Sequence, residues 1–347
     1  MKKLLKYSFG LLLFAFLSTG CSGTEKVSSE RTLHDSQTRY MSAAGSDFLR
    51  NQLNRGMESV IRIQITAGYR TFQFDLDDLP TRAELEGTDF SERALDTMLD
   101  HNSRAGSALV LSNRRGNSVL LTPSHVVSYP DTVWHFTEGS VRTPQGRVEA
   151  VSVRESISRF IIGSHGIYEF EVGVNDPDQD LALMIKRWGS NDRPELTPLQ
   201  IEAGNYEALE WSDQVYAIGY PLGVGMITRG MVSKSIHSPR RSFVFDASIN
   251  RGFSGGAIFA ERSDGSGLEW VGMVLSASAS HEEYLVPERD SDMEFHPDLE
   301  YRGAVFVERK QRINYGITYA VGIDQIREFI NNHRDILSEQ EIRLPEL

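Results

Sequence analysis

The sequence contains a single cysteine, Cys21, among its 347 residues. A disulfide needs two thiols, so the chain beyond residue 21 can hold neither a disulfide nor a catalytic thiol. Basic residues are also few: 36 Lys and Arg stand against 48 Asp and Glu, which gives a formal net charge of -12. Because nucleic-acid binding depends on clustered Lys and Arg, we expect no nucleic-acid partner.

The apolar run near the N-terminus, from Phe9 to Leu17, is too short to span a bilayer as a stable helix. Lys2, Lys3 and Lys6 precede this run, and small residues follow it up to Gly20. A basic start, a short apolar stretch and small residues are typical of a secretory signal that is removed from the mature protein.

The end of this signal, residues 17–21, resembles the lipobox of bacterial lipoproteins, with Ser18 at a position where leucine is commonest. The resemblance implies cleavage before Cys21 and attachment of a lipid to that cysteine. Ser22 follows, in place of the aspartate that often signals retention in the inner membrane. We therefore expect a lipid-anchored protein of the bacterial cell envelope, held in the outer membrane and facing the periplasm.

The rest of the composition is that of a globular protein, with 40% hydrophobic and 24% charged residues. Residues 22–46 are polar and show no sustained period, which favours a flexible tether. The expected organisation is a signal at 1–20, a lipidated cysteine and tether at 21–55, a folded domain at 56–337 and a tail at 338–347.

Short β-branched and apolar segments separated by Gly-rich turns dominate the domain and predict an all-β barrel or sandwich. A helix is expected at 88–98, where Leu95 and Met98 share one side, and a second helix is expected to be capped by Asp324. The acidic stretch 281–300 is expected to be an exposed loop, with a metal or partner site as the alternative. Strands are expected at 59–65, 69–79, 106–111, 118–121, 147–153, 181–185, 215–220, 227–235, 257–259, 270–275 and 317–321.

The segment 246–258 carries the strongest chemical signal, because Ser254 stands between glycines in Gly252-Phe253-Ser254-Gly255-Gly256 and an apolar strand follows. A nucleophilic serine needs its hydroxyl held at a tight turn, and a developing oxyanion needs convergent backbone N–H donors. Glycine allows both because it tolerates positive φ and close approach of another backbone. An ordinary Gly/Ser loop between strands would show the same residues. Whether Ser254 is a nucleophile therefore depends on whether the chain also supplies a base and a group that orients it.

Two such groups precede the serine. His125, one of nine histidines, follows the apolar strand 118–121, and Asp180 stands where an acidic turn enters the strand 181–185. Serine attack on an amide needs a base for the hydroxyl proton, and that base needs an acceptor that fixes its tautomer. His125, Asp180 and Ser254 are therefore a candidate catalytic triad.

The same acidic turn also has the alternating carboxylates of a calcium loop, at Asp176, Asp178 and Asp180. Leu181 stands where such a loop needs glycine, and Arg187 stands where it needs glutamate. We therefore expect no calcium here, and no metal or other cofactor for the chain as a whole.

These segments resemble the trypsin-like serine proteases, specifically the Deg/HtrA branch. The branch reads Thr-Asn-x-His-Val-Val around its histidine, where this chain has Thr-Pro-Ser-His-Val-Val at 122–127. It reads Asp-hydrophobic-Ala-Leu/Val-Leu around its aspartate and Asp-Ala-Ala-Ile-Asn-Arg/Pro-Gly-Asn-Ser-Gly-Gly around its serine, matched here by 180–184 and 246–256. The loop 219–223 and the end 316–321 also look like landmarks of the branch.

The resemblance extends over residues 59–329 and implies a chymotrypsin-like double β-barrel with a C-terminal helix, the triad lying in the cleft between two six-stranded barrels. It makes Ser254 the nucleophile, His125 the general acid and base, and Asp180 the group that orients the histidine. It also implies an oxyanion hole formed by the backbone N–H groups of Gly252 and Ser254. The implied activity is that of a serine endopeptidase acting on protein or peptide substrates.

By the same resemblance, Ser248 lies at the base of the primary specificity pocket, and Met273 and Val274 lie in its wall, which favours an uncharged side chain before the scissile bond. Phe253 departs from the asparagine of the branch. No PDZ domain is expected after Val321 within this sequence, so no oligomeric state is predicted. These departures support an alternative, a catalytically silent or partner-activated binding protein on a protease fold.

Overall fold

The computed structural model describes residues 44–114, 116–137, 146–164, 166–189, 196–233, 241–287 and 305–342, together with 344 and 346. These residues belong to one compact unit. Within the described ranges, no helix is both long and apolar enough to cross a membrane. The expected signal and Cys21 lie outside the described residues.

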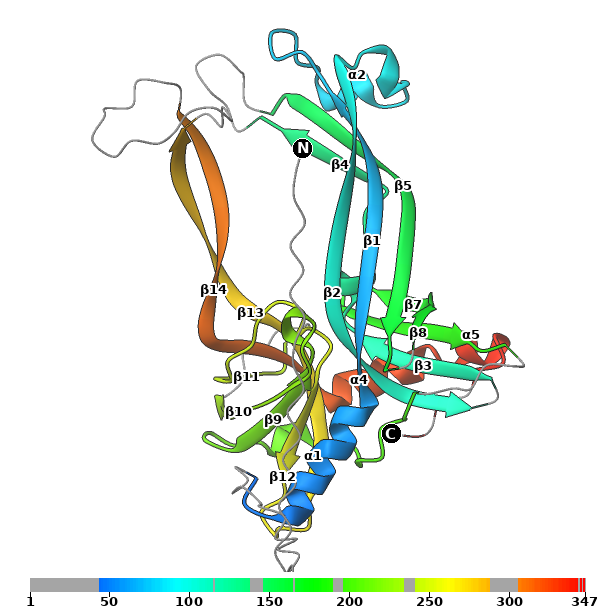
Figure 1. Cartoon of the computed structure of the whole chain (residues 1–347), viewed down its shortest axis with the longest axis vertical. Helices are drawn as coiled ribbons and strands as arrows, with labels where there is room; N and C mark the ends of the chain where they lie inside the picture. The colour runs from blue at the N-terminus through cyan, green and yellow to red at the C-terminus, as the bar shows by residue number, and fades with distance from the viewer. Residues whose placement is uncertain are drawn as a thin grey trace, which may run out of the picture. The chain divides into compact units, whose positions relative to one another are not determined.

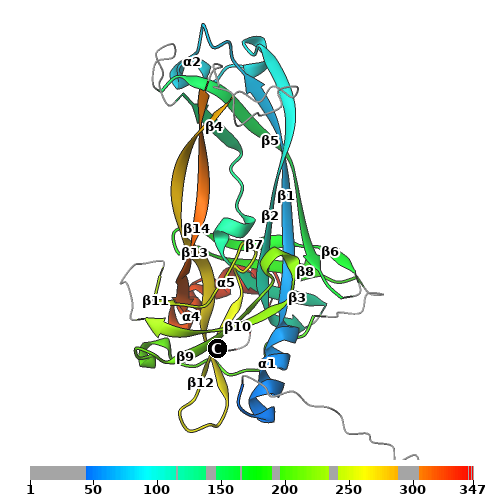
Figure 2. The same ribbon diagram turned by 60° about the vertical axis from the view of Figure 1, so that its left-hand side comes forward.

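The first half of the unit is an eight-stranded sheet in the order β4-β5-β1-β2-β3-β8-β7 (Figure 1). Strand β6, labelled in Figure 2, pairs with β5 beside this path. All paired strands of this sheet are antiparallel. Because β4 and β7 end the order without pairing with each other, the sheet is open, whereas a closed barrel was expected. The strands are β1 Val60–Gln73, β2 Asp96–Arg114, β3 Asn117–Thr122, β4 Thr132–Phe136, β5 Val148–Ile162, β6 Ile167–Glu169, β7 Glu171–Asp176 and β8 Leu181–Arg187.

The second half is a closed six-stranded barrel in the order β10-β11-β14-β13-β12-β9, as expected. Its strands are β9 Gln214–Gly219, β10 Met226–Ser233, β11 Phe243–Phe245, β12 Ala257–Glu261, β13 Leu268–Pro287 and β14 Val305–Gly322. Beyond the barrel, β13 and β14 continue as a two-stranded ribbon as far as the pair Pro287 and Val305 (Figures 1 and 2). The expected mainly β architecture is therefore confirmed.

Short helical segments complete the unit. The α-helices are α1 Asp47–Ser59, α2 Arg82–Leu85, α3 Ser124–Val127, α4 Ile323–Asn332 and α5 Arg334–Glu339, and the 3-10 turns are η1 Phe90–Glu92, η2 Tyr206–Ala208 and η3 Pro221–Gly223. Helix α1 begins where the Ser46 hydroxyl accepts a hydrogen bond from the N–H of Leu49, and it buries Leu49 and Leu53. The folded part therefore begins well before residue 56, where the tether was expected to end.

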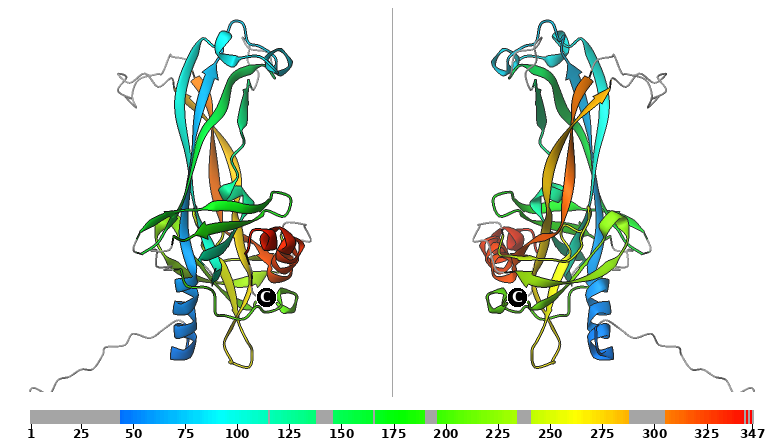
Figure 3. Two further views of the ribbon diagram at one scale, coloured as in Figure 1. Left: turned by 90° about the vertical axis from the view of Figure 1, so that its right-hand side faces the viewer. Right: turned by 90° about the vertical axis from the view of Figure 1, so that its left-hand side faces the viewer.

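One apolar core joins the two halves. It contains Leu49 of α1, Leu109 of the first sheet, Ile218 and Phe259 of the barrel, and Phe329 of α4. Of the C-terminal helices, red in Figure 3, α4 packs against β13 and β14, and α5 packs against α4. Burying a side chain of this size stabilises the fold by about 1.5–3 kcal/mol, so the shared core fixes the loops at the junction of sheet and barrel.

The expected helix at 88–98 is absent. Asp89 caps only the 3-10 turn η1, and Asp96 then begins strand β2 opposite Gln73. Leu95 and Met98 are 72% and 47% exposed, so neither builds the buried stripe that a helix in a globular domain needs. Pairing with β1 overrides the helical spacing of the two residues.

Two further expectations need correction. Helix α4 has Gly322 as its N-cap, and Asp324 lies inside its first turn, where it pairs with Arg327 at 2.7 Å. The first part of the acidic stretch, His281–Pro287, belongs to strand β13 and is not a loop. The remainder of that stretch, 288–300, lies outside the described residues.

Candidate active site

Strand pairing brings His125 and Asp180 to one edge of the first sheet. Strands β3 and β8 are antiparallel neighbours in which Thr122 pairs with Ala182. His125 lies three residues after the end of β3, on the short helix α3, and Asp180 directly precedes β8. The end of β3 therefore lies beside the start of β8, which brings His125 and Asp180 together although they are far apart in the sequence.

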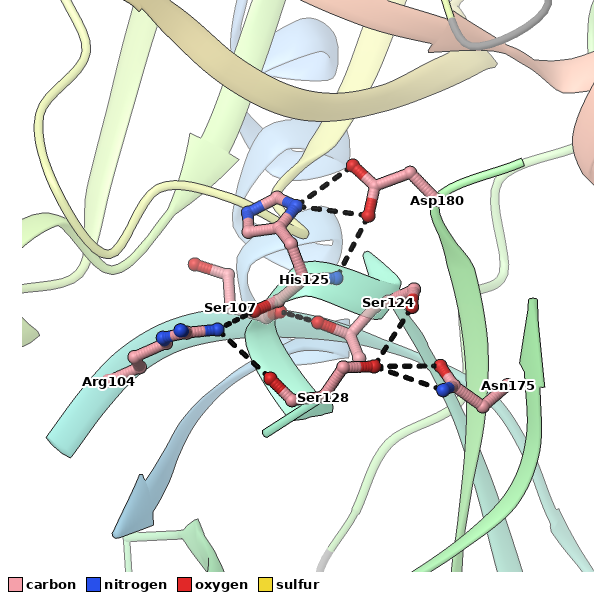
Figure 4. A network of polar contacts seen from close by, with 8 residues as sticks. Arg104, Ser107, Ser124, His125, Ser128, Asn175 and Asp180 are labelled. Atoms are coloured by element: carbon pink, nitrogen blue, oxygen red, sulfur yellow. Dashed lines mark hydrogen bonds and ion pairs between the residues drawn. The ribbon is translucent and has the colours of Figure 1, made fainter. Parts of the chain in front are cut away.

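The Asp180 carboxylate contacts both the backbone N–H and the imidazole ring of His125 (Figure 4). The main-chain N–H of His125 donates to Asp180 Oδ1 at 2.9 Å. The ring Nδ1 lies 2.8 Å from Oδ2 and 3.1 Å from Oδ1 of the same carboxylate. Because an ionised carboxylate only accepts hydrogen bonds, Nδ1 carries a proton and Nε2 of a neutral ring is left as an acceptor. This is the tautomer that a general base for a serine requires.

The turn before β8 holds the Asp180 carboxylate in position. Asp180 has a φ of 56°, in the left-handed region that aspartate tolerates better than most residues. Asp176 Oδ1 accepts hydrogen bonds from the N–H groups of Asp178 and Gln179 at 2.9 and 3.0 Å. The Asp176 carboxylate therefore shapes the turn, and among the described residues no cluster of three His, Cys, Asp or Glu forms a candidate metal site.

Arg104, on β2, binds the C-terminal end of helix α3, which carries His125 (Figure 4). Its Nη1 donates to the carbonyl of His125 at 2.6 Å and to that of Ser128 at 3.0 Å. The guanidinium lies 4.5 Å from the centre of the Tyr129 ring, and burial raises the pKa of the Tyr129 phenol while the Arg104 charge opposes that rise. The Ser128 hydroxyl accepts from Asn175 Nδ2 at 3.0 Å. The backbone that carries His125 is thus hydrogen-bonded on both sides.

The loop of Ser254 is tied to the first sheet by a buried serine, Ser107, on β2. Ser107 N–H donates to the Ser254 carbonyl at 2.8 Å, and its hydroxyl donates to the Gly252 carbonyl at 2.8 Å. That hydroxyl also accepts from the N–H of Tyr220 at 2.8 Å, and the Ser107 carbonyl accepts from Thr122 Oγ1 at 2.9 Å. Each polar group of Ser107 therefore has a partner, and together they join the sheet to the serine loop.

Two glycines of this loop are required by its geometry. Gly252 and Gly255 have φ values of +95° and +91°. A Cβ on Gly255 would lie 1.9 Å from the Ser107 carbonyl oxygen, and one on Gly252 would lie 2.7 Å from the Tyr220 carbonyl oxygen. Both contacts are with backbone atoms that cannot move aside, so a side chain at either position would deform the loop.

The expected oxyanion donors are available. Within the described part of the chain, the N–H groups of Gly252 and Ser254 donate to no protein acceptor, whereas Gly255 N–H donates to Val274 O and Phe253 N–H to Asn250 O. Two backbone N–H groups flanking one residue are the kind of donor pair that stabilises a developing oxyanion. The Phe253 side chain is fully buried in the barrel core and anchors the loop between them.

Ser254 lies beside the histidine helix, but its hydroxyl is not bonded to the imidazole. A Cβ on Gly106 would lie 2.6 Å from Val126 Cγ1 and 3.4 Å from the Ser254 carbonyl oxygen, so the serine backbone is close to the residue after His125. The hydrogen bonds of the described residues include none between Ser254 Oγ and His125. The structure thus joins the histidine to the aspartate and places the serine near them without closing the triad.

The residues assigned to the specificity pocket lie in different surroundings. Ser248 is exposed, whereas Met273 and Val274 are fully buried in two separate core clusters. Residues 276–278, which follow them on β13, are partly exposed. The pocket assignment stays a prediction.

Sequence reasoning missed Ser107 and Arg104. A signal for Ser107 is present, because it is a polar residue that opens the apolar run 108–111, and a polar group in a buried strand must find hydrogen-bond partners. Arg104 gives no comparable signal, because its role depends on carbonyl groups that only the folded chain brings to it.

Comparison with known proteins finds one family model that matches the central segment of the chain. Residues 106–272, which include His125, Asp180 and Ser254, match the family model of the trypsin-like peptidase domain. No curated protein matches the chain significantly in sequence.

Similar solved structures include HtrA-type protease AlgW with a decapeptide, at 18% identity and a TM-score of 0.45, covering 83% of this chain and 67% of that one. HtrA-type protease AlgW with a tripeptide is 16% identical with a TM-score of 0.42, covering 85% of this chain and 64% of that one. The chain thus spans about two thirds of the length of these proteins.

Proposed function

We propose that this chain, whose residues 106–272 match a trypsin-like peptidase domain, is a serine endopeptidase that hydrolyses protein or peptide substrates through His125, Asp180 and Ser254. The observation that carries the proposal is the bond of 2.8 Å between His125 Nδ1 and Asp180. This bond leaves Nε2 of a neutral ring as an acceptor that can serve as a base. The free N–H groups of Gly252 and Ser254 support it.

In the proposed mechanism, Ser254 Oγ attacks the substrate carbonyl carbon while His125 Nε2 takes the hydroxyl proton. The oxyanion of the tetrahedral intermediate accepts hydrogen bonds from the N–H groups of Gly252 and Ser254. The intermediate collapses to an acyl-enzyme, and the leaving amine takes the proton from Nε2. Water then attacks the ester with His125 as base, which releases the acid and restores the serine. Asp180 stays ionised and stabilises the imidazolium.

A second candidate is favoured by one observation, the missing hydrogen bond between Ser254 Oγ and His125. In this alternative the chain is a protease-fold binding protein that is silent, or one that becomes active when a partner brings the serine to the imidazole. Proton transfer needs the two groups within about 2.6–3.2 Å, although catalytic hydrogen bonds are often longer before substrate binds. The complete set of Ser, His and Asp favours the enzyme.

Cleavage assays on the full-length protein separate the two. We expect the parent chain to cleave casein and a peptide library of varied P1 residues, and Ser254→Ala to cleave neither. Ser248, assigned to the base of the specificity pocket, carries no charge that would attract a basic side chain. We therefore expect cleavage after uncharged residues, and cleavage mainly after Lys or Arg would contradict that part. Failure of both folded proteins to cleave any substrate would favour the silent or partner-activated binding protein.

We further propose that a lipid on Cys21 holds the enzyme in the bacterial outer membrane, facing the periplasm. The support is the sequence pattern of residues 1–21 alone. Mass spectrometry of the N-terminal peptide should find the diacylglyceryl group on Cys21. Cys21→Ser should release the protein from the membrane fraction, and a parent protein recovered without lipid would contradict the anchor.

A further inference from the structure

A cavity of about 500 Å³ lies where α1 runs into β1, between the end of β5 and the turn η3. None of the three residues of the proposed triad lines it. Its lining combines the side chains of Met57, Ile61 and Leu196 with Glu58, Arg62 and Tyr220. Ser164 and Thr197 also line it, so the cavity is of mixed character. Among the described residues, apolar side chains stand there beside one cation and one carboxylate.

Arg62 is a cation without an anion in this cavity. Its Nε is buried and has no hydrogen-bond partner. The hydrogen bond that its side chain makes runs from Nη2 to the neutral Gln64 Oε1 at a long 3.4 Å. No carboxylate of the described residues lies within ion-pair distance of it, although Glu58 shares the lining. A guanidinium carries five N–H donors in a planar fork that fits a carboxylate. Because Nε is buried, the two Nη groups are the donors that face a ligand in this cavity.

The combination selects the chemistry of the ligand. Apolar walls favour an aliphatic group, and an unpaired guanidinium favours a carboxylate over a neutral amide of the same shape. A dication or a strongly polar anion would leave the apolar lining without a partner. The matching ligand is thus a small amphipathic carboxylate, which can come from a free aliphatic acid or from the C-terminal residue of a peptide.

The turn η3 connects this cavity to the loop of Ser254. Tyr220 and Gly223 line the cavity, and a Cβ on Gly223 would lie 2.7 Å from Arg62 Nη1, so the guanidinium packs on this glycine. On its other side, the same turn donates from Leu222 N–H to Arg251 O at 2.9 Å. The Tyr220 carbonyl also packs directly against Gly252, one of the two proposed oxyanion donors. A ligand on Arg62 would therefore touch the segment that supports the oxyanion loop.

We propose that this cavity binds a small amphipathic carboxylate through Arg62, and that the bound ligand acts on the Ser254 loop through the Tyr220–Gly223 turn. The effect on Ser254 rests on the proposed peptidase function. The binding itself does not rest on it.

Binding is tested by calorimetry on the full-length Ser254→Ala protein, so that no turnover interferes. The probes are octanoate and N-acetyl-leucine, each compared with its amide. We expect at least one acid to bind about tenfold or more tightly than its amide, and the tighter acid identifies the source of the ligand. Acids and amides that bind equally, or do not bind, would overturn the site.

Variants locate the binding. Arg62→Met should abolish the preference for the acid, Arg62→Lys should keep part of it, and Glu58→Gln should tighten acid binding because it removes a like charge from the lining. Arg82→Met, at an exposed arginine paired with Glu86 outside this lining, is the matched control and should bind as the parent does. A preference that survives in folded Arg62→Met would overturn the assignment to Arg62.

The action on Ser254 is tested by the rate at which a fluorophosphonate labels the parent chain with and without saturating acid. We expect a change of about threefold or more that disappears in Arg62→Met. An unchanged rate despite binding would overturn the connection through the turn. A parent chain that is never labelled would count against the peptidase function instead, and the calorimetry would still decide the cavity.

Discussion

The hydroxyl of Ser107 donates a hydrogen bond of 2.8 Å to the carbonyl of Gly252, across the junction between the first sheet and the barrel. The same hydroxyl accepts from Tyr220 N–H, so one oxygen holds both the serine loop and the turn η3. His125 and Asp180 lie at the ends of β3 and β8 of the first sheet, whereas Ser254 lies in the loop before β12 of the barrel. Ser107 is therefore in a position to set the distance between the base and the nucleophile.

Ser107→Ala should lower the catalytic rate strongly while the protein still folds. The change leaves the Gly252 carbonyl and the Tyr220 N–H without their partner, at a cost of about 1–3 kcal/mol. We expect kcat/KM to fall by about tenfold or more while the protein stays folded. The matched control is Ser112→Ala, at another buried serine of β2. Equal loss of activity in both variants would contradict a positioning role for Ser107.

Asp180→Asn should leave the fold intact and remove most of the activity. An amide in place of the carboxylate no longer fixes the proton on His125 Nδ1, and by the logic of the serine triad this lowers kcat by a factor on the order of 10³–10⁴. Thermal unfolding of parent and variant checks the fold, and peptide cleavage at constant pH checks the rate. Activity within tenfold of the parent would exclude Asp180 from the proposed role.

Gly255→Ala should disrupt the serine loop, because its Cβ would lie 1.9 Å from the Ser107 carbonyl oxygen. We expect a loss of more than about 3 kcal/mol in the free energy of unfolding, or no folded protein. Gly265→Ala is the matched control, since Gly265 also has a positive φ, +71°, but no atom within 4 Å of the added Cβ. That variant should lose only about 1–2 kcal/mol, and urea unfolding compares the two. Equal losses would show that the backbone strain of a positive φ, and not the contact with the Ser107 carbonyl, causes the loss of stability.

Phe253→Asn, which restores the residue typical of the resembled proteases, should destabilise this chain. The Phe253 ring is fully buried in the barrel core, so the change removes an aromatic side chain and buries an amide. Large-to-small changes of this kind cost about 3–5 kcal/mol in the free energy of unfolding. Phe253→Leu, which stays apolar, should lose clearly less. A Phe253→Asn protein as stable as the parent in urea would contradict the anchoring role.

The sequence predicts the site best where a functional residue lies directly at the end of a buried strand. His125 and Asp180 were found because each stands at an end of a buried strand, and the pairing of Thr122 with Ala182 places those ends together. Expectations failed where distant pairing decides the structure. Leu95 and Met98 have helical spacing, yet β2 pairs there with β1, and His281–Pro287 becomes a strand only because β14 lies beside it.

Other parts of the site could not be predicted, because they depend on groups that are remote in the sequence. Nothing near Ser107 indicates that its hydroxyl reaches Gly252. In the separate cavity, nothing near Arg62 indicates that its Nε will be buried without a partner. Closure of the first sheet depends on whether β4 and β7 meet, which strand patterns do not specify.

The most direct test of the central claim is covalent labelling of the full-length protein with a fluorophosphonate, followed by peptide mapping. The account predicts a single adduct on Ser254 that is greatly reduced in His125→Ala, because the serine then lacks its base. A folded parent chain that forms no adduct, or forms it equally well without His125, would contradict the proposal that these residues make a serine endopeptidase.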